Sequence, residues 1–192
     1  MQARLIRREV LPFLLSMVAL VAVALLVDAF LHLYDVVWIG RYLGIPGTLL
    51  ILGSFGYSLR KRKLIRAGRP ESLLRLHERM AWLGSLLVLV HAGILFNAIL
   101  GWLAVGAMLV NVGSGLTGKF LLGRARARIE AARKHMLEQG VGSSAIEERM
   151  YWDSLTFDVV KQWRAVHFPI TLAFAVLALA HIIAVFLFWG WK

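Results

Sequence analysis

The chain contains no cysteine among its 192 residues. It therefore has no disulfide, no thiol nucleophile, no c-type haem attachment and no cysteine-ligated iron–sulfur cluster. Charge is also scarce, because Asp, Glu, Lys and Arg make up 17% of the residues, against about 25% in an ordinary soluble domain. Hydrophobic residues make up 59%. This composition excludes a soluble globular domain and a disordered chain.

Four long uncharged runs account for the shortage of charge. They cover residues 10–27, 42–59, 80–118 and 165–191. A membrane-spanning helix needs about 20 apolar residues, so the 39-residue run at 80–118 predicts two spans joined by a tight turn near Asn97–Trp102. We expect an all-α integral membrane bundle of five transmembrane helices, forming a single domain over 1–192. The spans are predicted at about 10–31, 42–60, 73–98, 101–121 and 165–189.

Two helix signals lie outside these runs. Pro70 suits the first turn of a helix, so the third helix is expected to begin there, in the cytoplasm. The cytoplasmic loop 122–164 is expected to form two surface helices with a break at Gly140-Val141-Gly142. Ser144 and Glu147 have the spacing of a capping box before the second one.

The basic residues are distributed asymmetrically around the predicted spans. Lys and Arg number 22 against 11 Asp and Glu, and 20 of the 22 precede the first span or follow the second and fourth. The other side has Arg41 and Lys192. The positive-inside rule therefore predicts a multi-pass protein of the cytoplasmic (inner) membrane, with the N-terminus in the cytoplasm and the C-terminus outside. Anionic membrane lipid explains the positive charge, so no nucleic-acid partner is expected.

Four of the six histidines form two pairs with the same spacing. His77 precedes His91 by 14 residues, and His167 precedes His181 by 14. Fourteen helical steps of about 100° fall only about 40° short of four turns, so both members of a pair face one way, about 21 Å apart. Spans three and five run parallel in the predicted topology. His77 can then lie opposite His167, and His91 opposite His181.

Opposed histidines at two depths predict two b-type haems, one above the other. A haem iron can be held by one neutral imidazole on each side of the ring. A lone histidine in a span is often a helix-packing residue, but ionisable groups inside membranes are rare and usually functional. A zinc or copper site would need ligands clustered within a few ångströms. We therefore expect His77, His167, His91 and His181 to be the metal ligands.

The residues around these histidines resemble a known family. Arg164-Ala165-Val166-His167-Phe168-Pro169 looks like the second ligand helix of cytochrome b from quinol–cytochrome c complexes, and Arg75-Leu76-His77 is similar to the first. Ligand pairs on spans three and five also resemble ferric-reductase-like membrane cytochromes. The resemblance covers about residues 73–189. The Pro-Glu-Trp-Tyr motif of quinol oxidation does not occur in the sequence. Flavin- and nicotinamide-binding regions do not occur either, so a reductase domain would be another chain.

Several residues are candidates for contact with the haems. Glycine lets a helix approach a flat ring, and the candidates are Gly84, Gly101 and Gly115. Haem propionates favour arginine, and the candidates are Arg75, Arg79, Arg164 and Arg41. The ordinary alternatives are small-residue helix packing for the glycines and positive-inside flanking for the arginines.

Two polar clusters are candidates for a quinone site, which needs a protonatable group near a haem. The outer cluster is Asp28, His32, Tyr34 and Asp35, directly after span one. The cytoplasmic cluster is Glu78, Asp153, Asp158 and Lys161. Either can be a hydrated interfacial loop instead, and the sequence leaves the side of the quinone site open.

Residues 113–119 match two nucleotide-binding patterns, G-x-G-x-x-G and G-x-x-x-x-G-K. Both patterns require a preceding strand and a following soluble helix. Here they end a predicted span, and Phe120 replaces the Ser or Thr that would hold magnesium. No nucleotide site is expected.

The expected function is electron transfer by a subunit of a multi-subunit respiratory oxidoreductase. It would pass electrons between quinone or quinol and a partner subunit that carries iron–sulfur, flavin or c-type haem. An alternative is the haem-bearing subunit of a ferric-reductase-like or sulfoxide-reductase-like system fed by a separate flavoprotein. A third is a membrane transporter or scaffold without redox activity.

Overall fold

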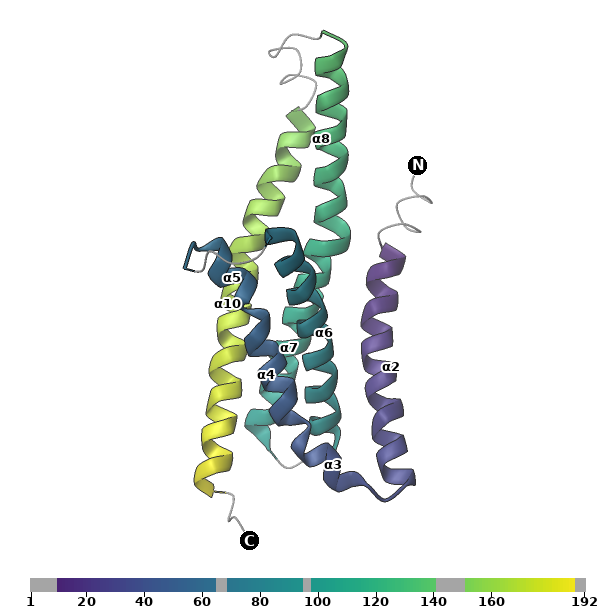
Figure 1. Ribbon diagram of the computed structural model, residues 1–192, viewed down its shortest axis with the longest axis vertical. Coiled ribbons are helices and arrows are strands. Elements are labelled where there is room, and N and C mark those ends of the chain that lie inside the picture. Colours follow the sequence, from purple (N-terminus) through teal and green to yellow (C-terminus); the bar gives the residue numbers. More distant parts are fainter. Residues whose placement is uncertain (1–9, 65–68, 95–97, 141–150, 189–192) are drawn as a thin grey trace. The chain divides into compact units, whose positions relative to one another are not determined.

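The computed structural model describes residues 10–64, 69–94, 98–140 and 151–188, and every regular element in these ranges is a helix (Figure 1). In chain order they are α2 (Leu11–Leu33), α3 (Val37–Tyr42), α4 (Gly44–Ser54), α5 (Gly56–Lys61), α6 (Pro70–Ile94), α7 (Ile99–Leu116), the π-helical η2 (Thr117–Leu122), α8 (Gly123–Glu138) and α10 (Tyr151–Phe188). The all-α class is confirmed.

Four stretches of helix are long and apolar enough to cross a membrane. They are Leu11–Leu33, Val37–Arg60, Ile99–Phe120 and Ala165–Phe188. Large apolar side chains on these stretches face outward, with Leu26 68% and Phe188 84% exposed. Soluble proteins rarely expose apolar surface of this extent, whereas lipid would cover it. The chain is a multi-pass membrane protein with four candidate spans.

Helix α6 covers residues 73–94 of the remaining predicted span, 73–98, and residues 95–97 lie outside the described ranges. It is not one of the four candidates among the described residues. It begins at Pro70, as expected. Its first turns carry charge, and it includes two histidines. Both features lower its mean hydropathy below that of the other long helices. The charged residues are Glu71, Arg75, Glu78 and Arg79.

Two helix ends differ from the predicted positions. Helix α2 continues past residue 31 to Leu33, so His32, like Asp28, lies inside the helix. Helix α7 begins at Ile99, so Trp102 is helical and the connection from α6 comes earlier than expected. Hydropathy sets the length of a span only approximately, since polar residues near an end can also be helical.

The segment after the fourth predicted span also differs from expectation. Helix α8 ends at Glu138, and Gly140 follows in the left-handed conformation with φ 74°, a common helix ending. Residues 151–164 are not a separate surface helix, because α10 runs unbroken to Phe188 and contains Pro169. The charged residues before 165 favour helix as much as the apolar ones after it. Val141, Gly142, Ser144 and Glu147 lie outside the described residues.

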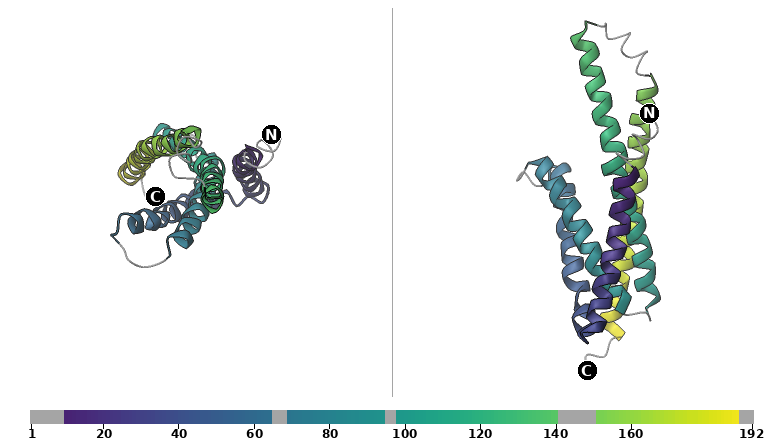
Figure 2. Two further views of the ribbon diagram at one scale, coloured as in Figure 1. Left: turned by 90° about the horizontal axis from the view of Figure 1, so that it is seen from above. Right: turned by 90° about the vertical axis from the view of Figure 1, so that its right-hand side faces the viewer.

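The chain divides into two compact units. The smaller unit is 1–16 with 113–170, and the larger is 17–112 with 171–192. Within the larger unit, α4 and α6 lie side by side (Figures 1 and 2). They run antiparallel, since Ser54 near the end of α4 contacts His77 near the start of α6.

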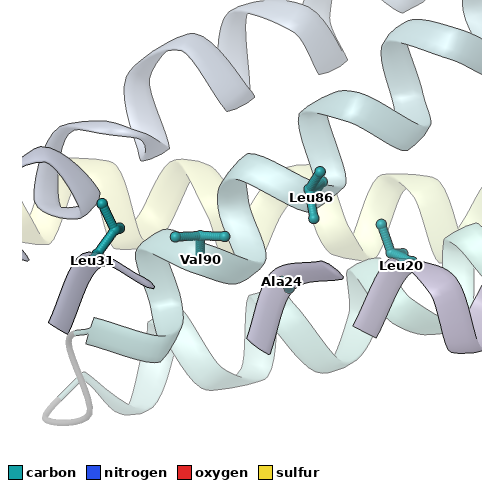
Figure 3. Close-up of a cluster of buried hydrophobic side chains, with 5 residues drawn as sticks. All are labelled: Leu20, Ala24, Leu31, Leu86 and Val90. Carbon is teal, nitrogen blue, oxygen red and sulfur yellow. The ribbon is translucent and has the colours of Figure 1, made fainter. Parts of the chain in front are cut away.

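The core of the larger unit lies between α2 and α6 (Figure 3). Leu20, Ala24 and Leu31 of α2 are buried against Leu86 and Val90 of α6. Between helices in a membrane, such close packing supplies van der Waals attraction where the hydrophobic effect does not act. This contact fixes the face that α6 turns toward α2.

Gly47 and Gly84 mark the closest approach of α4 and α6. A Cβ atom on Gly84 would lie 2.8 Å from the main-chain oxygen of Gly47 and 3.2 Å from the nitrogen of Ile51. Glycine permits this separation because it has no side chain. The crossing sets the position of α6 and of both its histidines.

Candidate functional site

His91 of α6 and His181 of α10 face each other within the larger unit. Their ring centroids are 6.5 Å apart, with 63° between the ring planes. An imidazole nitrogen lies about 2 Å from its metal and about 1 Å from its own ring centre, so two ligands of one iron have centroids about 6 Å apart. The separation of His91 and His181 fits two axial ligands of a single haem.

Glycines border both of these rings. A Cβ atom on Gly44 would lie 2.8 Å from Cδ2 of His91, and one on Gly101 would lie 3.3 Å from Cε1 of His181. A larger residue at Gly44 would displace the His91 ring. Gly101 is thus beside a candidate ligand, and its contact with a haem stays a prediction. Gly44 is a further position that the sequence reasoning missed.

The two histidines of α6 have their Nδ1 atoms occupied by main-chain oxygens. His77 Nδ1 donates to the carbonyl of Ser54 at 2.8 Å, and His91 Nδ1 donates to that of Gly40 at 3.3 Å. A carbonyl only accepts, so the proton lies on Nδ1 and the lone pair on Nε2. Metal-binding histidines have this arrangement, because the outer hydrogen bond fixes the tautomer and the ring.

The residues opposite α6 follow a seven-residue register that the sequence reasoning missed. Gly40, Gly47 and Ser54 are buried and seven positions apart. They lie opposite His91, Gly84 and His77, in that order. The repeat of small residues in 40–54 was the available signal, since it matches the spacing of His77, Gly84 and His91.

In the smaller unit, His167 is held by two neighbours. Its Nδ1 lies 3.0 Å from Oγ of Ser114. The indole of Trp163 stacks on its ring with centroids 5.2 Å apart and 22° between planes. His77 belongs to the larger unit and His167 to the smaller.

The other predicted haem contacts lie in different surroundings. A Cβ atom on Gly115 would have no atom within 4 Å, whereas Gly84 packs at the crossing with α4. The side chains of Arg41, Arg75 and Arg79 are exposed, and Arg75 Nη2 lies 3.5 Å from Oγ of Ser72. The side chain of Arg164, like those of Asp153, Asp158 and Lys161, lies outside the described part of the chain. Exposure leaves the three described arginines open to anionic groups.

Of the outer quinone-site candidates, Asp28 and His32 lie in contact with each other. His32 Nδ1 lies 2.9 Å from the main-chain oxygen of Asp28 and 3.7 Å from its Oδ1. That Oδ1 is buried and has no hydrogen-bond partner in the described ranges. It packs against Gly93, where a Cβ atom would lie 3.5 Å away. Asp35 is exposed in the following turn, with φ 55°.

Two alternative sites receive no support from the described residues. Within 10–64, 69–94, 98–140 and 151–188, no three His, Asp or Glu gather closely enough to hold a metal ion. Residues 113–119 lie in α7 and η2. They do not form the strand–loop–helix unit that nucleotide binding requires.

Comparison with protein-family models, curated proteins and solved structures finds no match to this chain. The fold therefore defines the class only as an all-helical protein with four candidate membrane spans.

Proposed function

We propose that the protein is a membrane-bound di-haem cytochrome b. It acts as an electron-transfer subunit of a multi-subunit respiratory oxidoreductase and passes electrons between the quinone pool and a partner redox protein. The observation that carries the proposal is the facing pair His91 and His181, with ring centroids 6.5 Å apart.

The first haem is assigned to His91 and His181, and the second to His77 and His167. The second assignment rests on the shared 14-residue spacing of the two pairs in the sequence. A bound haem supplies one-electron redox chemistry. The protein orients the imidazoles of α6, and the Nδ1 bonds of His77 and His91 to main-chain oxygens support this role.

The proposal includes α6 as a fifth span in the cytoplasmic membrane, with the N-terminus inside and the C-terminus outside. Within the larger unit, α6 packs along α2 and α4, which belong to two candidate spans. Its polar histidines would be matched by a cofactor rather than by water. The placement of 20 of 22 basic residues on one side supports the orientation.

Quinone is proposed as electron donor or acceptor near the outer pair. Asp28 supports this assignment, because its buried Oδ1 packs against Gly93, two residues after His91. Quinone reduction and quinol oxidation need a group that exchanges protons. The exposed His32, beside Asp28, can relay them to water.

Spectroscopy of the purified full-length protein tests the proposal. We expect a b-type reduced-minus-oxidised spectrum, two haems per chain by the pyridine assay, and reduction by a short-chain quinol that quinone analogues inhibit. A colourless protein would refute the haem assignment and favour a transporter or scaffold. Bound haem that a flavoprotein reduces and quinol does not would indicate the ferric-reductase-like alternative.

A further inference from the structure

We propose that Ser114 and Trp163 are positioning residues for His167, and that the Ser114 hydroxyl sets the reduction potential of the haem that His167 holds. The inference rests on the proposed function, because it assigns a role to the neighbours of one candidate ligand. All the residues that carry it lie within the smaller unit, 113–170.

The hydrogen-bond partner of His167 differs in kind from those of His77 and His91. Those two histidines donate to main-chain oxygens of Ser54 and Gly40, whereas Nδ1 of His167 meets a side-chain hydroxyl, Ser114 Oγ, at 3.0 Å. A carbonyl is fixed by the helix and only accepts. A hydroxyl can rotate and also donate, so the strength of this bond depends on how Ser114 is held.

Trp163 holds both Ser114 and the imidazole. Its indole Nε1 donates to the main-chain oxygen of Ser114 at 2.9 Å, and its ring stacks on His167. The indole also lies against Gly118, where a Cβ atom would overlap the ring. Ser114, Trp163 and His167 therefore form one connected unit in which the plane of the imidazole is fixed.

The Ser114 hydroxyl affects the electron density at Nε2. An acceptor on Nδ1–H makes the imidazole a stronger ligand, which favours the oxidised iron. Without the hydroxyl, the equilibrium constant for reduction of this haem iron should increase by up to about tenfold. For a one-electron couple, a tenfold change is equivalent to about 59 mV. The midpoint potential of this haem should then rise.

Redox titration of the detergent-solubilised full-length protein tests this expectation. Ser114→Ala should raise the midpoint potential of one haem and leave that of the other unchanged. Ser114→Thr keeps a hydroxyl at this position, so both potentials should match those of the wild-type protein. Thr117→Val is the matched control, because Thr117 Oγ1 donates to the oxygen of Gly113 at 2.9 Å on the same helical stretch. It loses a hydroxyl of the same kind and should leave both potentials unchanged.

A second pair of variants decides the matter if Ser114→Ala assembles poorly. Trp163→Phe keeps a stacked ring and should retain the low-temperature electron paramagnetic resonance g-values, whereas Trp163→Leu should shift those of one haem. Unchanged potentials and g-values in a protein with two haems would overturn this inference and leave the proposed function intact. A wild-type protein without haem would overturn both.

Discussion

The imidazoles of His91 and His181 lie with their ring centroids 6.5 Å apart, although 90 positions separate the two residues in the chain. His91 is oriented by the main-chain oxygen of Gly40 and bordered by Gly44. Gly101 borders His181. Two segments of the larger unit, 37–54 and the start of α7, thus border one histidine pair with glycines or a main-chain oxygen.

Replacing either outer histidine should remove one haem and leave the other. We expect His91→Ala and His181→Ala each to lower the content from two haems per chain to one, because each substitution removes one of the two axial ligands proposed for that haem. The pyridine assay on purified protein measures this. His135→Ala is the control, since His135 is exposed on α8. A haem content unaffected by both substitutions would contradict the assignment.

Enlarging Gly44 should disturb the haem proposed at His91 and His181 through the ring of His91. A Cβ atom there would lie 2.8 Å from Cδ2 and 3.0 Å from Nε2 of His91. Gly44→Ala should therefore lower the occupancy of the haem proposed between His91 and His181. In the molecules that still bind this haem, its absorption spectrum should be shifted. Gly56→Ala is the control, because no atom lies within 4 Å of the added Cβ. Equal spectra for the two variants would show that Gly44 does not limit the ring.

Substitution at the α4–α6 crossing should lower stability. Gly84→Ala would place a methyl group 2.8 Å from the main-chain oxygen of Gly47, and the main chain cannot move aside as a side chain can. Overpacking of this kind costs about 1–3 kcal/mol. Thermal unfolding in detergent, followed by circular dichroism, measures the loss. Gly106→Ala in α7, with nothing within 4 Å, should be neutral or stabilising, since alanine favours helix.

Replacing the carboxyl group of Asp28 with an amide should impair proton exchange at the proposed quinone site without affecting haem binding. We expect Asp28→Asn to retain both haems and to slow reduction by quinol, because the buried Oδ1 can no longer exchange a proton. Stopped-flow reduction by quinol and by dithionite distinguishes the two effects. Glu71→Gln is the control, since Glu71 is exposed in the first turn of α6. Normal quinol kinetics in Asp28→Asn would remove Asp28 from the proposed quinone site.

Much of the helix pattern was predictable from the sequence. Long apolar runs require internally hydrogen-bonded backbone in a membrane, and the structure has helices at all five predicted positions. Helix ends were less predictable. Asp28 and His32 remain in α2, and 151–164 continue into α10, because hydropathy reports the preference for lipid and not the end of a helix.

The haem-contact candidates show a similar limit. Gly84 is a predicted haem contact, and the structure packs it against Gly47 of α4. Single-sequence periodicity gives the face on which a residue lies, but not the element that covers that face. Ser54 and Gly40 were missed for the same reason, since their contribution is a main-chain oxygen that every residue has.

The sequence by itself determined that the chain is helical, apolar and free of thiol chemistry, and it placed four histidines in two pairs of equal spacing. These properties depend on residue type and helical period, which are local. Only the tertiary structure decided that His91 meets His181 and that Ser114, Ser54 and Gly40 orient individual imidazoles. Such contacts join residues 23 to 90 positions apart, and they depend on how closely two helices pack.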